Sequence, residues 1–412
     1  MQERALPVPT TSARSAGTLQ GVVLLLPITL AVMGIAVLVP IVPQLMSHFA
    51  AVPHHQYLIQ GGVLTMPALC VALLSPLAGW LTDRTGRRRL LIGSMLVYAL
   101  VGVAPVLLDS LYAVITARVA VGLCEAIVMT VSTTLISDYF SGHAREHWLA
   151  RQTAVASLSS LALIPLGGVL GHEFGWRGPF CVYAISAALA AAVWLFTWEP
   201  ERPAAEVLSA VQANGSSTAI PWARIVGICA ITLFASVMFY TIQTQSGLAL
   251  AVLGVHDATR IGLLTMMASL GVPAGTFVFG AAARLPIGGL LALEFLLIGI
   301  GFAGMGQAAG PAAFVGAAAL NQLGCGMVLP TLLTWVSRGL AFEVRGRGTG
   351  IWTSTFAVGQ FLSGLVVTWL ATQAGGLLRA FLVLSVLACT AAALAGGGHW
   401  VARARSAGLE AR

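Results

Sequence analysis

Two ionisable residues, Arg118 and Glu125, lie inside a long apolar stretch of the chain, residues 111–139. Their spacing of seven, with Gly122 between them, places all three on one face of an α-helix. A carboxyl group in a low-dielectric environment favours its protonated form, whereas a nearby guanidinium favours the charged form. Movement of Glu125 between two such environments is a means of proton exchange. Arg118 is a candidate to modulate that exchange or to bind a substrate.

The same pair also has a purely structural interpretation. Arg118 and Glu125 could form an ion pair that neutralises both charges and fixes the packing of neighbouring helices. Charged side chains are expensive within a membrane, and each one is therefore a functional candidate by default. The residues alone leave both interpretations open.

The composition identifies a membrane protein. The chain has 412 residues, of which 58% are hydrophobic and 8% charged, whereas a soluble domain carries roughly 25% charged residues. The mean hydropathy is +0.91. Every basic residue in the Lys+Arg count is arginine, which excludes a P-loop lysine and a Schiff-base lysine. The net charge of +7 reflects membrane orientation, and we expect no nucleic-acid partner.

The chain shows no arrangement of residues that is typical of an enzyme or of a metal site. The six cysteines are well separated, without CxxC spacing, and we expect them to be buried small hydrophobic residues. A glycine pattern at 299–304 matches the dinucleotide fingerprint but lies inside an apolar segment, where it predicts helix packing. We therefore expect no enzymatic activity, no cofactor and no metal.

Twelve apolar segments predict twelve membrane-spanning helices, each near or above the roughly 20 residues that a crossing needs. They comprise 19–49, 57–79, 90–108, 111–139, a fifth ending near residue 171, 175–198, 225–252, 261–283, 286–307, 311–336, 349–372 and 377–398. The expected organisation is a tail (1–18), a six-helix bundle (19–198), a polar linker (199–223), a second six-helix bundle (224–398) and a C-terminal tail (399–412).

The arginines predict the orientation of these spans. With both termini in the cytoplasm, only Arg177, Arg260 and Arg379 fall on the outer side and Arg118 lies within the membrane; all other arginines are cytoplasmic. This distribution follows the positive-inside rule. The expected location is the inner membrane of the cell.

A short charged loop, G-W-L-T-D-R-T-G-R-R-R at 79–89, separates the second and third apolar segments. This pattern resembles the loop between helices 2 and 3 of major facilitator superfamily transporters. A weaker copy about 200 residues later keeps Arg284 but lacks the aspartate. The resemblance implies an all-α membrane protein with two pseudo-symmetric six-helix bundles. It also implies that the gating loop, represented here by Gly79, Asp83, Arg84, Gly86 and Arg87, closes the cytoplasmic side in the outward-facing state.

Two further segments resemble motifs of the same superfamily. The Arg118-x-x-x-Gly122 pattern is similar to the helix 4 motif, whose arginine is associated with proton coupling in exporters. Residues 162–171 are similar to the glycine–proline motif of antiporters, but Ile164 stands where that motif has the glycine before Pro165. Both likenesses favour export.

The superfamily fold implies that helices 1, 4, 7 and 10 line a central site. The cavity-lining candidates on this basis are neutral polar residues of the later helices: Tyr240, Gln243, Gln245, Asn321, Gln322 and Gln360. Interhelical hydrogen bonding is the structural alternative for each of them. Because helix 9 is peripheral in the family, its buried acid, Glu294, is expected to pack or to snorkel.

The resulting prediction is a secondary active transporter that works by alternating access. Its expected activity is proton-coupled efflux of small amphipathic compounds. The alternative is proton-coupled uptake of a small organic solute, such as an anion bound by Arg118. The expected partners are the substrate, protons and the lipid bilayer, and we expect a monomer.

Overall fold

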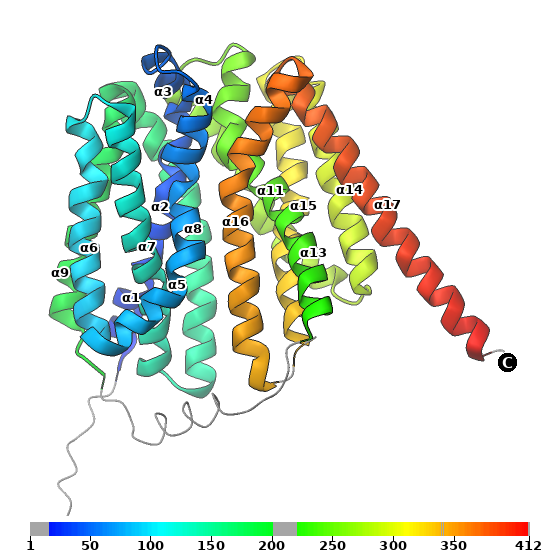
Figure 1. The fold of residues 1–412 in the computed structure, drawn as a ribbon, viewed down its shortest axis with the longest axis horizontal. Coiled ribbons are helices and arrows are strands. Elements are labelled where there is room, and N and C mark those ends of the chain that lie inside the picture. Colours follow the sequence, from blue (N-terminus) through cyan, green and yellow to red (C-terminus); the bar gives the residue numbers. More distant parts are fainter. Residues whose placement is uncertain (1–15, 201–220, 339, 341, 411–412) are drawn as a thin grey trace, which may run out of the picture.

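The computed structural model describes residues 16–200, 221–338, 340 and 342–410, and for some positions, such as 79, 83 and 398–410, it describes the backbone alone. All regular elements in this range are helices (Figure 1). In the first half they are α1 (Thr18–Leu25), α2 (Ile28–Ala36), η1 (Val39–Ile41), α3 (Val42–His48), α4 (His55–Tyr57), η2 (Leu58–Thr65), α5 (Met66–Thr85), α6 (Arg87–Val103), η3 (Ala104–Leu107), α7 (Leu111–Tyr139), α8 (Gly142–Phe174), η4 (Gly175–Ala184) and α9 (Ile185–Phe196). In the second half they are α11 (Trp222–Val252), α12 (Ala258–Ser269), α13 (Gly271–Ala282), α14 (Ile287–Gly306), α15 (Pro311–Arg338), α16 (Phe342–Ala374) and α17 (Leu377–Glu410).

In the described part of the chain the helices make twelve passes, in agreement with the sequence. Eleven stretches of the described chain are long and apolar enough to cross a membrane. One of them, Gly142–Phe196, has 55 residues, far more than the roughly 20 that one crossing needs. Inside it, Gly175 adopts a φ of +65° where α8 ends, and this stretch accounts for two passes, α8 and the pair η4–α9.

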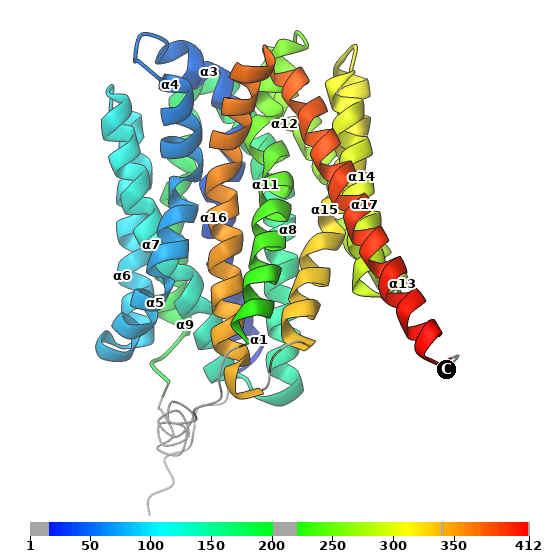
Figure 2. The ribbon, with the colours of Figure 1, turned by 45° about the vertical axis from the view of Figure 1, so that its right-hand side comes forward.

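Buried apolar side chains form two separate cores. The first draws on residues between Val23 and Val193, and the second on residues between Ile225 and Ala392. The two helical bundles stand side by side (Figures 1 and 2). α16 and α17 are longer than the predicted segments 349–372 and 377–398. The predicted boundaries of the tails and the linker stay predictions, because most of the linker lies outside the described residues.

Prolines interrupt the first span, as their chemistry requires. Proline lacks a backbone N–H and clashes with the preceding helical turn, so α2 starts directly after Pro27 and the short η1 contains Pro40. In the second span the short α4 is followed by η2, a π-helix. Within it the Thr65 hydroxyl donates to the Gln60 carbonyl oxygen at 2.9 Å. π-Helical segments are rare and often mark functional sites.

The two bundles pack closely at one end of the molecule. There, Gln60 Nε2 of η2 donates to the Thr244 carbonyl oxygen of α11 at 3.3 Å, and Thr65 Oγ1 donates to the Phe361 carbonyl oxygen of α16 at 3.0 Å. A Cβ added to Gly247 of α11 would lie 2.5 Å from the Val39 carbonyl oxygen of η1. Only glycine permits this approach of the two backbones.

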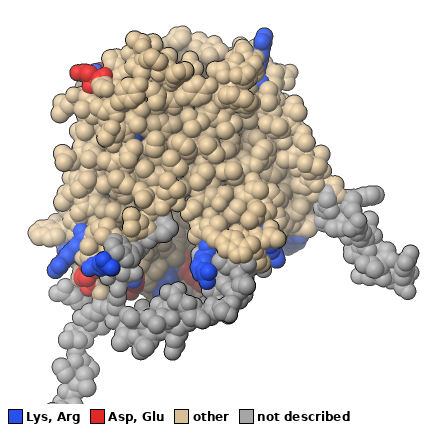
Figure 3. All heavy atoms as spheres, viewed as in Figure 1, with Lys and Arg blue, Asp and Glu red and all other residues tan. Residues whose placement is uncertain are grey.

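Arginine side chains gather at the other end of the molecule, which is hollowed between the two bundles (Figure 3). We call this the arginine-rich end and the closely packed one the opposite end. The structure therefore has one closed and one open end between its halves.

Candidate substrate and proton site

Arg118 is fixed inside the first bundle by three hydrogen bonds. It extends from α7, and its side chain is fully buried. Nε donates to the Val63 carbonyl oxygen of η2 at 2.6 Å, Nη1 to the Tyr183 hydroxyl of η4 at 2.7 Å, and Nη2 to the Gly34 carbonyl oxygen of α2 at 2.5 Å. Each guanidinium nitrogen thus has a protein acceptor, which satisfies a charge that would otherwise be costly to bury.

Glu125 lies near Arg118 without pairing with it. The side chain is 6% exposed, and its Oε2 atom is buried without a hydrogen-bond partner. A Cβ built on Gly34 would lie 3.0 Å from Glu125 Oε2 and 3.7 Å from Arg118 Nη2. Although both groups adjoin Gly34, no ion pair or hydrogen bond joins these two described side chains. The interpretation of the two residues as a direct ion pair is therefore wrong for this conformation, because Arg118 is held by other acceptors.

The sequence did not identify the groups that hold Arg118. Gly34, Val63 and Tyr183 come from three different spans, and two of them contribute only a carbonyl oxygen. The one signal in the sequence was the tyrosine inside an apolar span, because a buried tyrosine hydroxyl needs a hydrogen-bond partner. Gly122 serves packing: a Cβ there would lie 2.7 Å from Pro67 Cα of α5.

Three amides from the predicted cavity lining form a chain between α11, α15 and α14. Gln243 Nε2 donates to Gln322 Oε1 at 3.1 Å, and Gln322 Nε2 donates to Asn321 Oδ1 at 3.3 Å. Asn321 Nδ2 in turn donates to the Ile298 carbonyl oxygen at 3.1 Å. Asn321 and Gln322 are fully buried, whereas Gln243 is partly exposed and its Oε1 atom has no partner.

The other three cavity candidates lie apart from this chain. Tyr240 and Phe356 form an aromatic contact between α11 and α16, with ring centroids 5.6 Å apart. Gln360 is partly buried in α16. Gln245 donates to the Gly364 carbonyl oxygen at 3.4 Å and faces the opposite end, away from Gln243. Whether any of the six contacts a substrate stays a prediction.

Gln245 contributes to a recess of about 530 Å³ at the opposite end, between the two bundles. Its lining is apolar with a few neutral polar groups: Pro43, Met46, Ser47, His55, Gln56, Gln245, Leu248, Ala251, Val252, Thr368, Ala371 and Leu377. Gly247, which packs tightly against Val39, lies in the same stretch of α11 as the lining residues Gln245 and Leu248. In this conformation the recess is an outer vestibule.

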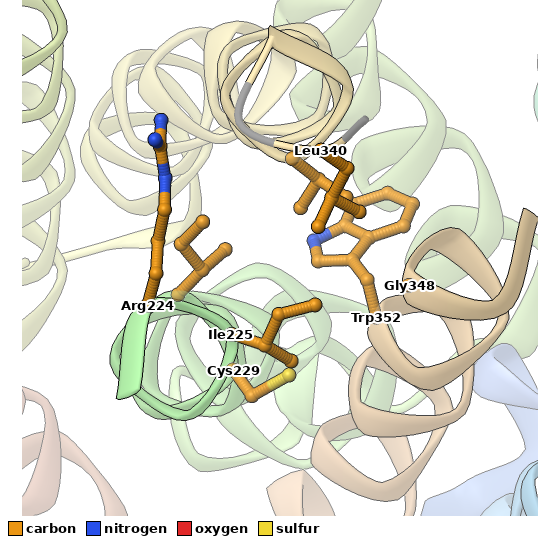
Figure 4. Close-up of a pocket in the computed structure, with 8 residues that line it drawn as sticks. Arg224, Ile225, Cys229, Leu340, Gly348 and Trp352 are labelled. Carbon is orange, nitrogen blue, oxygen red and sulfur yellow. The ribbon is translucent and has the colours of Figure 1, made fainter. Parts of the chain in front are cut away.

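A second, much smaller cavity lies at the arginine-rich end of α11, α15 and α16 (Figure 4). Its volume of about 10 Å³ is close to the minimum for one water molecule. The Trp352 indole lines it, and Nε1 of this buried ring has no hydrogen-bond partner. This cavity is too small for an organic substrate.

The charged loop is held by Glu199, which follows the last helix of the first bundle, and by Asp138 of α7. Gly86, with a φ of +88°, separates α5 from α6. Glu199 accepts hydrogen bonds from the backbone N–H groups of Arg87 at 2.6 Å and Arg88 at 3.0 Å. The Arg87 side chain forms an ion pair with Asp138 at the end of α7. Glu199, which the sequence analysis did not connect with this loop, therefore caps the start of α6.

The predicted gating role of this loop stays a prediction. The side chain of Asp83 and the surroundings of Gly79 lie outside the described residues, and Arg84 is exposed. The ion-pair partner of Arg87 in this conformation, Asp138, belongs to the same bundle.

The glycine–proline segment of α8 packs against both neighbouring spans. A Cβ on Gly167 would lie 2.0 Å from the Val37 carbonyl oxygen, and one on Gly168 would lie 2.6 Å from the Ala258 carbonyl oxygen. Ile164, which departs from the antiporter pattern, is buried. This segment thus brings the backbone of α8 against the second bundle at the opposite end.

The second buried acid, Glu294, lies inside the second bundle. It is fully buried, so it does not snorkel, and it accepts a hydrogen bond of 2.5 Å from the Thr331 hydroxyl of α15. Its Oε2 atom has no partner. The cysteines were expected to be buried, but Cys181 is exposed, and Cys229 and Cys389 are only partly buried. No cluster of His, Cys, Asp and Glu suited to a metal occurs among the described residues.

Comparison with known proteins assigns the family. A family model described as Major Facilitator Superfamily matches residues 24–362. The chain belongs to this superfamily. Members of this superfamily are in general transporters and not enzymes. They carry small molecules, often together with protons. This chain is therefore a multi-pass membrane transporter.

Individual relatives of this superfamily transporter have different activities. The tetracycline resistance protein, class C, of Escherichia coli is 26% identical over 370 residues, which cover 84% of this chain and 88% of the relative. A bacterial homologue of the human lysosomal transporter Spinster, in an inward-facing and unoccupied conformation, has a TM-score of 0.73 at 17% identity, covering 93% of this chain and 98% of that one. A D-xylose-proton symporter has a TM-score of 0.70 at 15% identity, covering 92% and 97%. These two structures show the shared fold.

Proposed function

We propose that this superfamily transporter exports small amphipathic compounds in exchange for protons, with Glu125 as the proton carrier. The observation that carries the proposal is the carboxylate of Glu125, which is buried in the first bundle with an oxygen atom that no protein group satisfies. A buried acid without a partner is a typical proton site in membrane transporters. Protonation supplies the neutral form that this environment favours.

The tethering of Arg118 favours this activity over uptake of an anion. All three guanidinium nitrogens donate to protein acceptors, and the side chain is fully buried. An anionic substrate that bound Arg118 would have to replace at least one of these hydrogen bonds. Arg118 is better suited to tune Glu125 than to hold a substrate.

Alternating access accounts for the closed and open ends. The opposite end is closed by backbone contacts such as that between Gly247 and Val39, and the arginine-rich end is hollowed (Figure 3). With the arginines in the cytoplasm of the cell, as the positive-inside rule predicts, this conformation faces inward. Both termini are then cytoplasmic, and the transporter works as a monomer in the inner membrane. Rocking of the two bundles would close the inner end and open the outer vestibule.

A second candidate function is proton-coupled uptake of a neutral polar solute. Gln243 is the partly exposed member of the amide chain, and its Oε1 atom is buried without a partner. On exposure to a substrate, this oxygen could accept a hydrogen bond from a hydroxyl group. The relationship to the tetracycline resistance protein, which covers most of both chains, favours export over this alternative.

A flux experiment distinguishes the two directions. The purified protein would be reconstituted in liposomes with a pH-sensitive dye inside, and tetracycline, lipophilic cations, organic acids and sugars would be added in turn. Export by antiport predicts proton movement opposite to an amphipathic compound. Proton movement in the same direction as a sugar or an organic acid would overturn the proposal in favour of uptake.

A further inference from the structure

Tyr183 is the only side chain among the three acceptors of Arg118. Its hydroxyl accepts a hydrogen bond from Nη1 at 2.7 Å and donates to the Gly34 carbonyl oxygen at 3.4 Å. The Tyr183 ring centroid lies 5.6 Å from Arg118 Cζ, and the side chain is fully buried. The hydroxyl thus holds one nitrogen of the guanidinium while the Gly34 carbonyl oxygen holds another.

Without this tether, the guanidinium has one obvious new acceptor. Glu125 Oε2 has no hydrogen-bond partner, and both it and Arg118 Nη2 lie within 4 Å of the point where a Cβ on Gly34 would stand. Opposite charges at such separation attract strongly in a low-dielectric interior. A guanidinium N–H group that loses its hydrogen-bond partner in the protein interior is more stable when it donates to a free carboxylate oxygen than when it stays unpaired.

We infer that Tyr183 is a positioning residue. It keeps the Arg118 guanidinium out of an ion pair with Glu125 and so sets the pH at which Glu125 exchanges its proton. This inference rests on the proposed role of Glu125 as the proton carrier. No other described side chain takes the place of the Tyr183 hydroxyl at Nη1.

Residues of α6 in the first bundle pack around the Tyr183 ring and fix its position. A Cβ on Gly102 of α6 would lie 2.3 Å from Tyr183 Cδ1, so that only glycine leaves room for the ring at this point. Tyr98 of α6 stacks on Tyr183 with ring centroids 5.4 Å apart, and its own hydroxyl donates to the Leu30 carbonyl oxygen at 2.7 Å. Two neighbouring tyrosines therefore bind different acceptors, and only one of them contacts Arg118.

Arg118 is the permanent charge that acts on Glu125. The other titratable groups within electrostatic reach are Cys70 of α5, Tyr98 of α6, Tyr183 itself and Tyr240 of α11. Thiols and phenols are ordinarily uncharged near neutral pH. A change in the position of the guanidinium is therefore the main local influence on the proton affinity of Glu125.

The matched variants are Tyr183→Phe and Tyr98→Phe. Each removes one buried hydroxyl from the same ring stack, but only Tyr183→Phe releases Arg118. The measurement is a pH titration of the purified protein by infrared difference spectroscopy, which follows the carbonyl band of the protonated carboxyl group. Loss of the band in Glu125→Gln assigns it to Glu125. Gly102→Ala, which displaces the Tyr183 ring without changing its chemistry, serves as a second test.

In Tyr183→Phe and Gly102→Ala we expect the titration midpoint of Glu125 to move to lower pH by about one unit, a tenfold loss of proton affinity, because the freed guanidinium stabilises the carboxylate. Tyr98→Phe should leave the midpoint in place. Unchanged midpoints in the first two variants, or an equal shift in Tyr98→Phe, would overturn the inference while the proposed function stands. A Glu125 band that does not titrate in the wild-type protein would overturn both.

Discussion

Glu125 of α7 occupies the space beside Gly34 of α2: a Cβ added to Gly34 would lie 3.0 Å from Glu125 Oε2. The same glycine offers its carbonyl oxygen to Arg118 Nη2 at 2.5 Å. One residue of the first span therefore borders both charged groups of the candidate site. This contact explains how a movement of the first span could change the environment of the carboxyl group.

We expect Gly34→Ala to reduce proton-coupled transport by about tenfold while the protein still folds. The added methyl group would press on the flexible end of Glu125, and overpacking of this kind typically costs 1–3 kcal/mol. Initial transport rates in liposomes, together with the melting temperature, measure the two effects. Gly93→Ala is the control, because a Cβ at Gly93 meets nothing within 4 Å. Normal transport by Gly34→Ala would show that the contact is unimportant.

Gly247→Ala should shift the transporter away from the conformation described here. The new Cβ would lie 2.5 Å from the Val39 carbonyl oxygen, a backbone atom that can move only if the two bundles separate. Spin labels placed on the two bundles at the opposite end would report a longer distance, and turnover would fall. Gly227→Ala, in the same α11 but in open space, should change neither. Equal distances in both variants would contradict this account of the closed end.

An ion pair at the opposite end predicts a pH-dependent closure. His172 Nδ1 of α8 lies 2.6 Å from Asp257 Oδ1, and Asp257 also caps α12 by accepting the backbone N–H of Arg260 at 2.7 Å. The hydrogen bond from this N–H lowers the pKa of Asp257 below its usual value, and the His172 side chain adds a smaller effect in the same direction. The carboxylate therefore stabilises the closed end above the pKa of a free aspartate, and its contribution is lost as the pH falls through the lower folded value.

We expect the closed end to lose stability as the pH falls through the titration range of the Asp257 carboxyl group, by less than about 1 kcal/mol because the pair is partly exposed. Asp257→Asn keeps a good helix cap but removes the charge. Spin-label distances should then no longer change as the pH is lowered below about 4, the usual pKa of an aspartate. A full pH response in Asp257→Asn would argue against the pair.

Glu199 should stabilise the charged loop. Its carboxylate accepts the backbone N–H groups of Arg87 and Arg88 at the start of α6, and removal of such a cap typically costs 0.5–2 kcal/mol. Glu199→Ala is therefore expected to lower the melting temperature of the purified protein. The exposed Glu146 provides the control variant Glu146→Ala, for which we expect no change. Equal stability of both variants would mean that the loop does not need the cap.

The sequence predicted the parts of the site that stand out against apolar surroundings. Arg118 and Glu125 could be found because two charges seven residues apart share one face of a long apolar helix. Their partners could not, since Gly34 and the Val63 carbonyl oxygen carry no signal of chemistry, and their closeness depends on how three spans pack. The absence of a direct ion pair is likewise a consequence of that packing.

The fold was predictable for a similar reason. Long apolar segments between polar turns indicate membrane spans, and the prolines of the first span predict its breaks. The grouping of the cavity candidates was predicted less well than the fold. Gln243 and Gln245 are two residues apart on α11, and side chains at that spacing do not face the same side of a helix. The structure separates them accordingly, with Gln243 in the amide chain and Gln245 in the outer vestibule.

The most direct test of Glu125 as the proton carrier compares two buried acids. Glu125 and Glu294 are both buried with an unpartnered Oε2 atom, one in each bundle. Proton flux driven by an exported compound would be measured in liposomes containing Glu125→Gln or Glu294→Gln. The account predicts that Glu125→Gln abolishes proton-coupled transport and that Glu294→Gln retains it. Full activity with an intact proton dependence in Glu125→Gln would contradict it.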